Sequence, residues 1–150
     1  MKTIGEVSKE FNLSISTIRY YDKEGLLKKV KRENGIRKFD EKDIETLFYI
    51  ECLKKAGMQI KDIKKFLDYV AKGNSTLKQR LEMITAQRET VEKEIAEKQN
   101  VLDVLKYKTW YYTEAIKLGD DSSLRNGDLS KMPPEIRECY TKTHPNKKEK

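Results

Sequence analysis

The sequence predicts a mainly α-helical protein with an N-terminal winged helix-turn-helix domain, a long dimerisation helix and a short tail. Three observations predict this fold class: two short amphipathic segments around a polar turn, a basic hairpin signal, and residues 75–118 without glycine or proline. The composition agrees, because 38% charged and 37% hydrophobic residues suit long, solvent-covered helices better than a large core. We expect three parts, residues 1–73, 74–118 and 119–150.

The first two helices are predicted from capping residues and apolar spacing. Thr3 precedes the first helix and Glu6 follows three residues later, which is the capping-box pattern. After a polar turn, either Ser14 or Ser16 can cap the second helix, and Gly25 ends it. Two short helices joined by such a tight turn predict a helix-turn-helix.

A basic hairpin and two further helices complete the predicted N-terminal domain. Asn34-Gly35 favours a two-residue hairpin turn, since both residues tolerate positive φ, so residues 28–39 are predicted to form a two-stranded wing. Asp40 caps a third helix that reaches Ala56, and a fourth helix covers residues 59–72. The apolar residues that we expect to face the core are Ile44, Leu47, Phe48 and Leu53 in the third helix, and Ile60, Ile63, Phe66, Leu67 and Val70 in the fourth.

The long helix carries a heptad repeat. With alternating spacings of four and three residues, nine of twelve positions are apolar, and the interruptions are Arg88, Lys98 and Thr109. We call the apolar row the seam: Leu77, Leu81, Ile84, Val91, Ile95, Leu102, Leu105, Tyr112 and Ile116. The small N-terminal domain cannot cover a stripe about 66 Å long, so the expected partner is the same helix of a second chain. Packing within one chain is the alternative, and the repeat does not distinguish parallel from antiparallel pairing.

The last part of the chain is polar and rich in turn residues. Pro133-Pro134 can start one short helix, and residues 144–150 are expected to be disordered.

The positive charge is concentrated on one short stretch. The net charge is +7, and residues 17–39 hold 8 basic and 3 acidic side chains. A polyanionic partner is therefore expected, with a solvated basic face that has no partner as the alternative.

Double-stranded DNA fits this charge and fold, because the second helix of a helix-turn-helix enters the major groove. An arginine there can contact guanine or phosphate, and the wing cations are expected to contact phosphates. Tyr20 and Tyr21 lie about 100° apart on a helix and cannot both face DNA equally. For Tyr21, a core position and a contact to the DNA backbone stay open. The predicted DNA-binding residues are Ser14, Ser16, Thr17, Arg19, Tyr20, Tyr21, Lys28, Lys31, Arg32, Arg37, Lys38 and Lys61.

Three segments together resemble the MerR family of bacterial transcription regulators. They are "TIGEVSKEFNLSISTIRYYDKEGLL", "RENGIRKFDEKDIETL" and "CLKKAGMQIKDIKKFL", and the resemblance covers residues 2–70 almost continuously. One departure is "LLKKVKR", where many members carry a proline, which is a local change at the entry to the wing.

The resemblance implies a homodimer joined by an antiparallel coiled coil. It implies binding to a palindrome in a promoter with an overlong spacer, and an unknown small-molecule effector that lets the dimer bend and untwist the DNA for RNA polymerase. Two other functions stay open: a coiled-coil scaffold whose basic domain docks an acidic protein, and a DNA-bending protein without an effector.

Two regions are candidates for sensing the effector. Cys52 in the third helix resembles the single thiol of the family branch that senses aldehydes or nitrosative stress; the alternative is a small buried hydrophobe. In the long helix, Tyr107, Trp110 and Tyr111, together with Tyr112, can line an apolar pocket or simply pack.

Several other classes of protein are disfavoured. The two cysteines are far apart, which suits a reducing cytoplasm and no disulfide framework. One histidine and no convergent thiols argue against a metal site and against catalytic cysteine or histidine chemistry. We expect no cofactor, no enzyme activity and no membrane-spanning segment.

Overall fold

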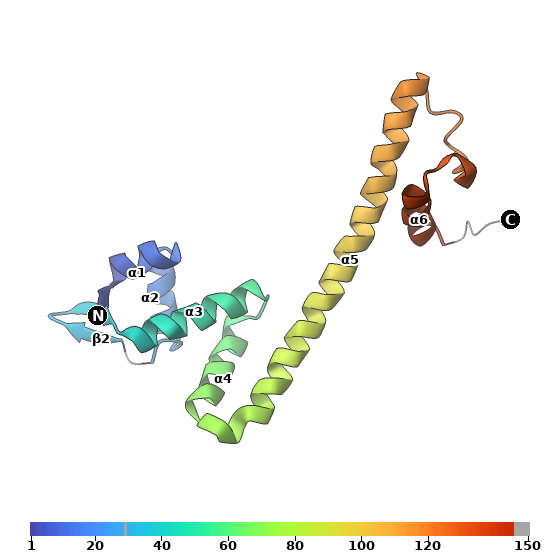
Figure 1. The fold of residues 1–150 in the computed structure, drawn as a ribbon. Coiled ribbons are helices and arrows are strands. Elements are labelled where there is room, and N and C mark those ends of the chain that lie inside the picture. The colour runs from blue at the N-terminus through green and yellow to red at the C-terminus, as the bar shows by residue number, and fades with distance from the viewer. Residues whose placement is uncertain (29, 146–150) are drawn as a thin grey trace. The chain divides into compact units, whose positions relative to one another are not determined.

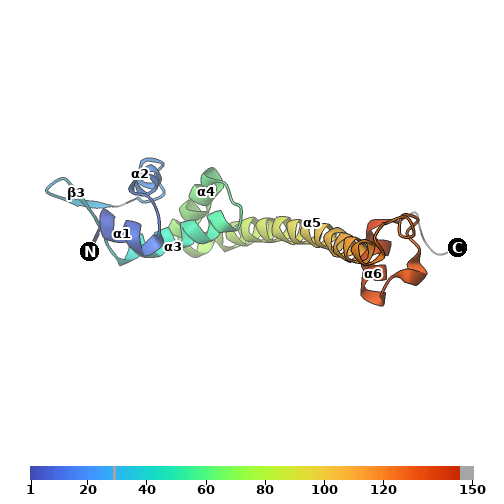
Figure 2. The same cartoon turned by 90° about the horizontal axis from the view of Figure 1, so that it is seen from above.

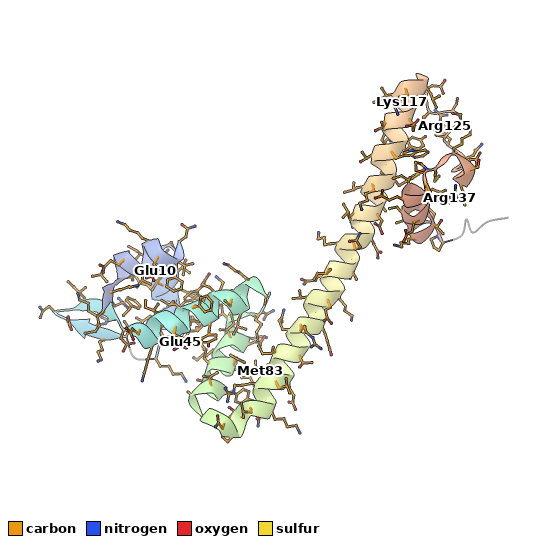
Figure 3. All side chains as sticks on the ribbon, in the orientation of Figure 1. Glu10, Glu45, Met83, Lys117, Arg125 and Arg137 are labelled. Atoms are coloured by element: carbon orange, nitrogen blue, oxygen red, sulfur yellow. The ribbon has the colours of Figure 1, made fainter. Side chains whose placement is uncertain are left out.

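The computed structural model describes residues 1–28 and 30–145 (Figure 1). The chain divides into two compact units, Met1–Val91 and Glu92–Lys150. This division differs from the expected parts, because it falls inside the long helix. The first turns of that helix pack with the N-terminal core through Met83 (Figure 3). Gln87 of the same helix donates a hydrogen bond to the Ala56 carbonyl.

The N-terminal unit contains the predicted helices and wing. Its elements are β1 Lys2–Thr3, α1 Ile4–Phe11, α2 Ile15–Lys23, β2 Lys31–Glu33, β3 Ile36–Phe39, α3 Glu41–Lys55, α4 Ile60–Ala71, a 3-10 turn Gly73–Thr76 and the start of α5 Leu77–Leu118. Thr3 caps α1 in a capping box with Glu6, and Asp40 caps α3 in another with Asp43. Of the two candidates for α2, Ser14 is the cap.

The wing is part of a three-stranded antiparallel sheet with the order β1-β3-β2. Asn34 and Gly35 have φ of 50° and 80°, which places both in the predicted hairpin turn. The additional strand β1 was not expected: Lys2 pairs with Phe39 and Thr3 with Lys38. A third strand supports the hairpin, which alone would be marginally stable. Figure 2 shows the hairpin projecting beyond α1 and α2.

One hydrophobic core holds these elements together. Its buried members are Val7, Ile18, Tyr21, Leu26, Leu27, Phe39, Leu47, Ile50, Met58 and Ile63. Two residues expected in the core are instead exposed, Phe48 at 58% and Val70 at 44%. In α3 the buried face passes through Leu47 and Ile50, and Phe48 points about 100° away from Leu47.

The second unit is built on the C-terminal part of α5. After α5 come a 3-10 turn, Leu129–Lys131, and the predicted short helix, α6 Pro134–Thr143. Its buried residues are Asp103, Ala115, Leu124, Met132, Cys139 and Tyr140. Arg137 of α6 donates to the carbonyl oxygens of Leu129 and Met132, which closes the turn before the helix (Figure 3).

Of residues 144–150, which were expected to be disordered, the structure describes residues 144 and 145. His144 stacks on Tyr140 with ring centroids 4.1 Å apart, so this residue is ordered. Residues 146–150 lie outside the described residues. Across the described part of the chain, no helix is long and apolar enough to cross a membrane.

Candidate nucleic-acid interface

Helix α2 separates a buried face from an exposed one. Ile18 and Tyr21 point into the core, and this fixes Arg19 and Tyr20 on the solvent side; Tyr20 is 46% exposed. Ser16 is exposed in the first turn. An exposed arginine, serine and tyrosine at the start of a helix can hydrogen bond to base edges and phosphates.

The hydroxyl groups at the start of α2 hydrogen bond to one another. The Ser14 hydroxyl accepts from the Thr17 amide at 3.0 Å, and it lies 2.7 Å from the hydroxyls of both Ser16 and Thr17. Ser14 therefore orders the helix terminus, and Thr17 is half-buried. Ser14 and Ser16 are both exposed, and Ser14 also holds the cap, so Ser16 is the exposed hydroxyl here that has no capping role.

The wing places like charges directly opposite one another. In the β2–β3 register, Lys31 pairs with Lys38 and Arg32 with Arg37. Like charges across a strand pair destabilise a sheet. Lys31 and Arg32 are exposed, and neither has an ion pair within 4 Å among residues 1–28 and 30–145. An anion bound along the wing would relieve this repulsion.

Arg37 holds the wing against the helix. Its Nε donates to Asp22 at 2.8 Å, and both side chains are only about a fifth exposed, at 23% and 22%. Arg37 is therefore also a positioning residue that joins β3 to α2, and its predicted phosphate contact stays a prediction. The sequence alone did not indicate this pair, because the two residues are 15 positions apart.

The remaining predicted cations differ in their environment. Lys28 forms an ion pair with Asp68 of α4, and this hydrogen bond holds the pKa of Asp68 below its ordinary value. Lys38 is half-buried in the central strand. Lys61 is exposed in the first turn of α4, whose N-cap, Gln59, makes no side-chain capping bond.

Tyr21 belongs to the core and is withdrawn as a DNA contact. Its ring is 1% exposed, and its hydroxyl donates to Glu51 and accepts from Lys54, both at 2.7 Å. The Lys54 ammonium also lies 5.3 Å from the ring centroid. Burial first, and then the hydrogen bond to Glu51, raise the pKa of Tyr21 well above its ordinary value. Neither the hydroxyl group nor the ring of Tyr21 is available to a ligand.

The seam is largely uncovered within one chain. Leu81 and Ile95 are more than 60% exposed, and Leu102, Leu105 and Tyr112 are about half exposed; Ile84 is less exposed and Val91 is half-buried. So long an apolar stripe is unfavourable in water without a partner.

The two sensing candidates lie in different surroundings. Cys52 is exposed and lines a cavity of α1 and α3 with Phe11, Leu13, Phe48 and Lys55, so it is not a buried hydrophobe.

The aromatic candidates pack on the tail. The ring centroid of Tyr107 lies 4.8 Å from that of Tyr140 in α6, and the Tyr111 hydroxyl donates to Asp121 at 2.8 Å. Trp110 is half-buried and Tyr112 is exposed. These contacts with the tail were missed because sequence does not show on which face of α5 it folds. In the described ranges, no three His, Cys, Asp or Glu side chains are grouped to hold a metal.

Comparison with known proteins gives consistent matches. Residues 2–70 match the family described as MerR HTH family regulatory protein, and residues 44–107 match the one described as MerR, DNA binding. An HTH-type transcriptional regulator of Haemophilus influenzae is 39% identical over 132 residues, which are 87% of this chain and 96% of the relative.

Two solved structures are similar over most of their length. HiNmlR, a MerR family regulator lacking the sensor domain, was solved bound to promoter DNA; it is 38% identical, with a TM-score of 0.68 over 81% of this chain and 98% of its own. A MerR family regulator from Bacillus thuringiensis is 39% identical, with a TM-score of 0.62 over 72% of this chain and 96% of its own.

Proposed function

Because this chain belongs to the MerR family of transcription regulators, we propose that it binds a palindromic promoter operator as a homodimer. Helix α2 enters the major groove, where Arg19 contacts a base edge or phosphate and Tyr20 donates its hydroxyl to the backbone. Lys31 and Arg32 of the wing contact flanking phosphates, and Lys61 is a further contact.

The observation that carries this proposal is the charge arrangement of the wing. Two consecutive like-charge pairs lie across β2 and β3. Arg37 of these pairs is bound to Asp22, and Lys31 interacts electrostatically with Asp40 and Asp43, but Lys31 and Arg32 are exposed and have no ion pair within 4 Å among residues 1–28 and 30–145. A protein that kept this hairpin only for stability would not need such repulsion. A phosphate backbone adds negative charge beside the exposed Lys31 and Arg32.

A binding measurement tests the interface. Fluorescence anisotropy on a labelled promoter fragment, selected by footprinting, should show loss of selective binding in Arg19→Ala, by about tenfold or more per half-site. Arg125→Ala is the matched control, because it removes the same charge from the tail, where Arg125 pairs with Asp121. Arg19→Ala with an unchanged footprint would refute the role of Arg19.

Salt dependence separates the wing from the helix. Replacing Lys31 or Arg32 by alanine should weaken binding to all sequences about equally and reduce the slope of log affinity against log salt by about one per contact. Equal affinity of the unmodified protein for any duplex would favour a DNA-bending protein without an effector. Absence of DNA binding at low salt would favour a scaffold for an acidic protein.

We also propose that the dimer forms along the seam, as an antiparallel coiled coil. The exposed apolar stripe supports this, since pairing of two copies would remove it from water. Leu102→Lys places a charge in the seam and should give monomers by sedimentation equilibrium. An intact dimer in this variant would contradict the assigned helix register.

Regulation is proposed to act through DNA shape. The dimer bends and untwists a promoter with an overlong spacer in response to an effector, so that RNA polymerase can use it; the deformation has an energetic cost that protein contacts offset. A regulator of this kind acts where the chromosome lies, so the proposed location is the cytoplasm. No catalytic step is required.

The exposed thiol of Cys52 is the proposed effector site. It opens into the cavity beside Phe11 and Phe48, where an electrophile such as an aldehyde could reach it. Cys52→Ser should block induction of the target promoter by electrophiles while DNA binding persists. Normal induction in Cys52→Ser would remove the thiol from consideration and leave the aromatic residues Tyr107, Trp110 and Tyr111 as candidates.

A further inference from the structure

Helix α6 lies beyond residue 107, where both family matches have ended, and it is fixed firmly to α5. Cys139 and Tyr140 are buried, and Tyr140 lies against Tyr107 on one side and stacks on His144 on the other. The Cys139 thiol also lies 3.7 Å from the buried carboxylate of Asp103. Figure 1 shows α6 alongside the C-terminal part of α5.

This packing uses a face of α5 next to the seam but not the seam itself. The residues under α6 are Asp103 and Tyr107, whereas the seam residues Leu102, Leu105 and Tyr112 remain about half exposed. The tail therefore does not take the place of a partner helix. It adds a second wall beside the surface on which such a helix would lie.

The two walls enclose a shallow, mainly apolar groove. Its floor and one side come from α5, including Leu102, Leu105 and Trp110, and its other side comes from Glu135 and Ile136 of α6. Ile136 is half-buried, and it lies between the exposed charged residues Glu135 and Arg137 of α6. A helix about 10 Å wide that lies on Leu102 and Leu105 would also touch Ile136.

We propose that α6 is a second part of the dimer interface: the α5 helix of a second copy lies in the groove between the seam and Ile136. The inference rests on the proposed homodimer and names what covers this groove. The occupant follows from continuity, because Leu102 and Leu105 belong both to the seam and to the groove wall. By twofold symmetry, each copy grips the other with its own α6.

The test compares matched substitutions on α6 in the full chain. Ile136→Asp places a charge in the groove, and Thr141→Asp adds the same charge at an exposed position that does not line it. Sedimentation equilibrium should show a dimer dissociation constant raised about tenfold or more for Ile136→Asp, and close to the unmodified value for Thr141→Asp. Ile136→Ala, which keeps a good helix former, should give a smaller rise in the same direction.

Trp110 provides a second readout, because it is the only tryptophan and lines the groove. On dilution of the unmodified protein, its emission should shift to longer wavelength as the dimer separates. In Ile136→Asp the same shift should occur at about tenfold higher protein concentration. Circular dichroism of each variant establishes that α6 and α5 remain helical.

Several outcomes would overturn the proposal. It fails if Ile136→Asp dimerises like the unmodified protein, or if Thr141→Asp weakens the dimer equally. It also fails if an apolar dye binds the groove of the intact dimer, because the groove would then be open. The proposed seam is tested separately: Leu102→Lys that stays dimeric refutes the seam itself, whereas monomeric Leu102→Lys with unaffected Ile136→Asp refutes only the role of α6.

Discussion

The adjacent residues Tyr20 and Tyr21 should respond in opposite ways to loss of their hydroxyl groups. Tyr21→Phe removes a buried hydroxyl that bonds to Glu51 and Lys54, both at 2.7 Å. Hydrogen bonds to charged groups contribute about 1.5–3 kcal/mol each, but Glu51 and Lys54 can still reach water, so we expect a net loss of about 1–2 kcal/mol. For a unit of this size that is a fall in Tm of about 5–10 °C.

Thermal unfolding of the full chain, followed by circular dichroism at a fixed protein concentration, measures the effect. Tyr20→Phe is the matched control, because Tyr20 is 46% exposed and its hydroxyl has no hydrogen-bond partner among residues 1–28 and 30–145. The free energy of unfolding of Tyr20→Phe should change by less than about 0.5 kcal/mol. The DNA affinities of the two variants, measured well below Tm, should rank in the opposite order to their stabilities. Tyr20→Phe should weaken operator binding by about twofold to tenfold, and Tyr21→Phe should leave it unchanged.

The pH dependence adds a third observable. The pKa of Tyr21 is raised in the folded state, so both states hold the proton below the ordinary pKa and stability is unaffected there. Above about pH 10 the unfolded state loses the proton first, and stability falls as pH rises. Tyr21→Phe should lack this part of the alkaline loss. The assignment of Tyr21 to the core would be refuted by a Tyr21→Phe protein that melts like the unmodified one, or by equal destabilisation in Tyr20→Phe.

Two further predictions concern contacts that the structure adds. Asp22→Asn breaks the ion pair with Arg37, so the wing should be held less firmly and operator binding should weaken by about threefold to tenfold. Because Arg37 is then free, the slope of log affinity against log salt should become steeper. A shallower slope would contradict the positioning role of Arg37. In native protein at neutral pH, iodoacetamide should label Cys52 at least about tenfold faster than Cys139, because Cys139 is 6% exposed and its burial raises the pKa of the thiol. Peptide mass mapping measures both rates, and equal rates would show that α6 opens readily.

Much of the N-terminal unit could be predicted from local patterns. The capping boxes at Thr3 and Asp40, the Asn34-Gly35 turn and the helix ends are each determined by residues within a few positions of one another. Such signals depend on backbone hydrogen bonding and φ preferences, which the nearest neighbours largely decide. The short helix after Pro133 was predicted in the same way.

The failures concern contacts between distant residues. Strand β1 has two residues, too few to show an alternating pattern, and it is fixed by pairing with β3. The partners Asp22 and Arg37 meet only when the wing folds back on α2. For Phe48, hydrophobicity predicted burial, whereas the position of α3 against the core left it at the surface. Spacing along one helix does not reveal which face its neighbours cover.

The candidate site followed the same division. That Arg19, Tyr20, Lys31 and Arg32 would lie on the surface followed from the pattern of charge and apolar spacing. The sequence pattern did not show which cations already have an acidic partner. Lys28, for example, pairs with Asp68 of α4, which lies 40 positions further along the chain.

The bond between Arg37 and Asp22 has a consequence for how a duplex is chosen. Because this bond joins the hairpin to the helix, the distance between the wing cations and the start of α2 is fixed. Duplexes in which the major groove and its flanking phosphates lie the same distance apart would be bound without distortion, and stiffer or wider duplexes would not. Base pairs that no side chain reaches would then still influence which sites are occupied.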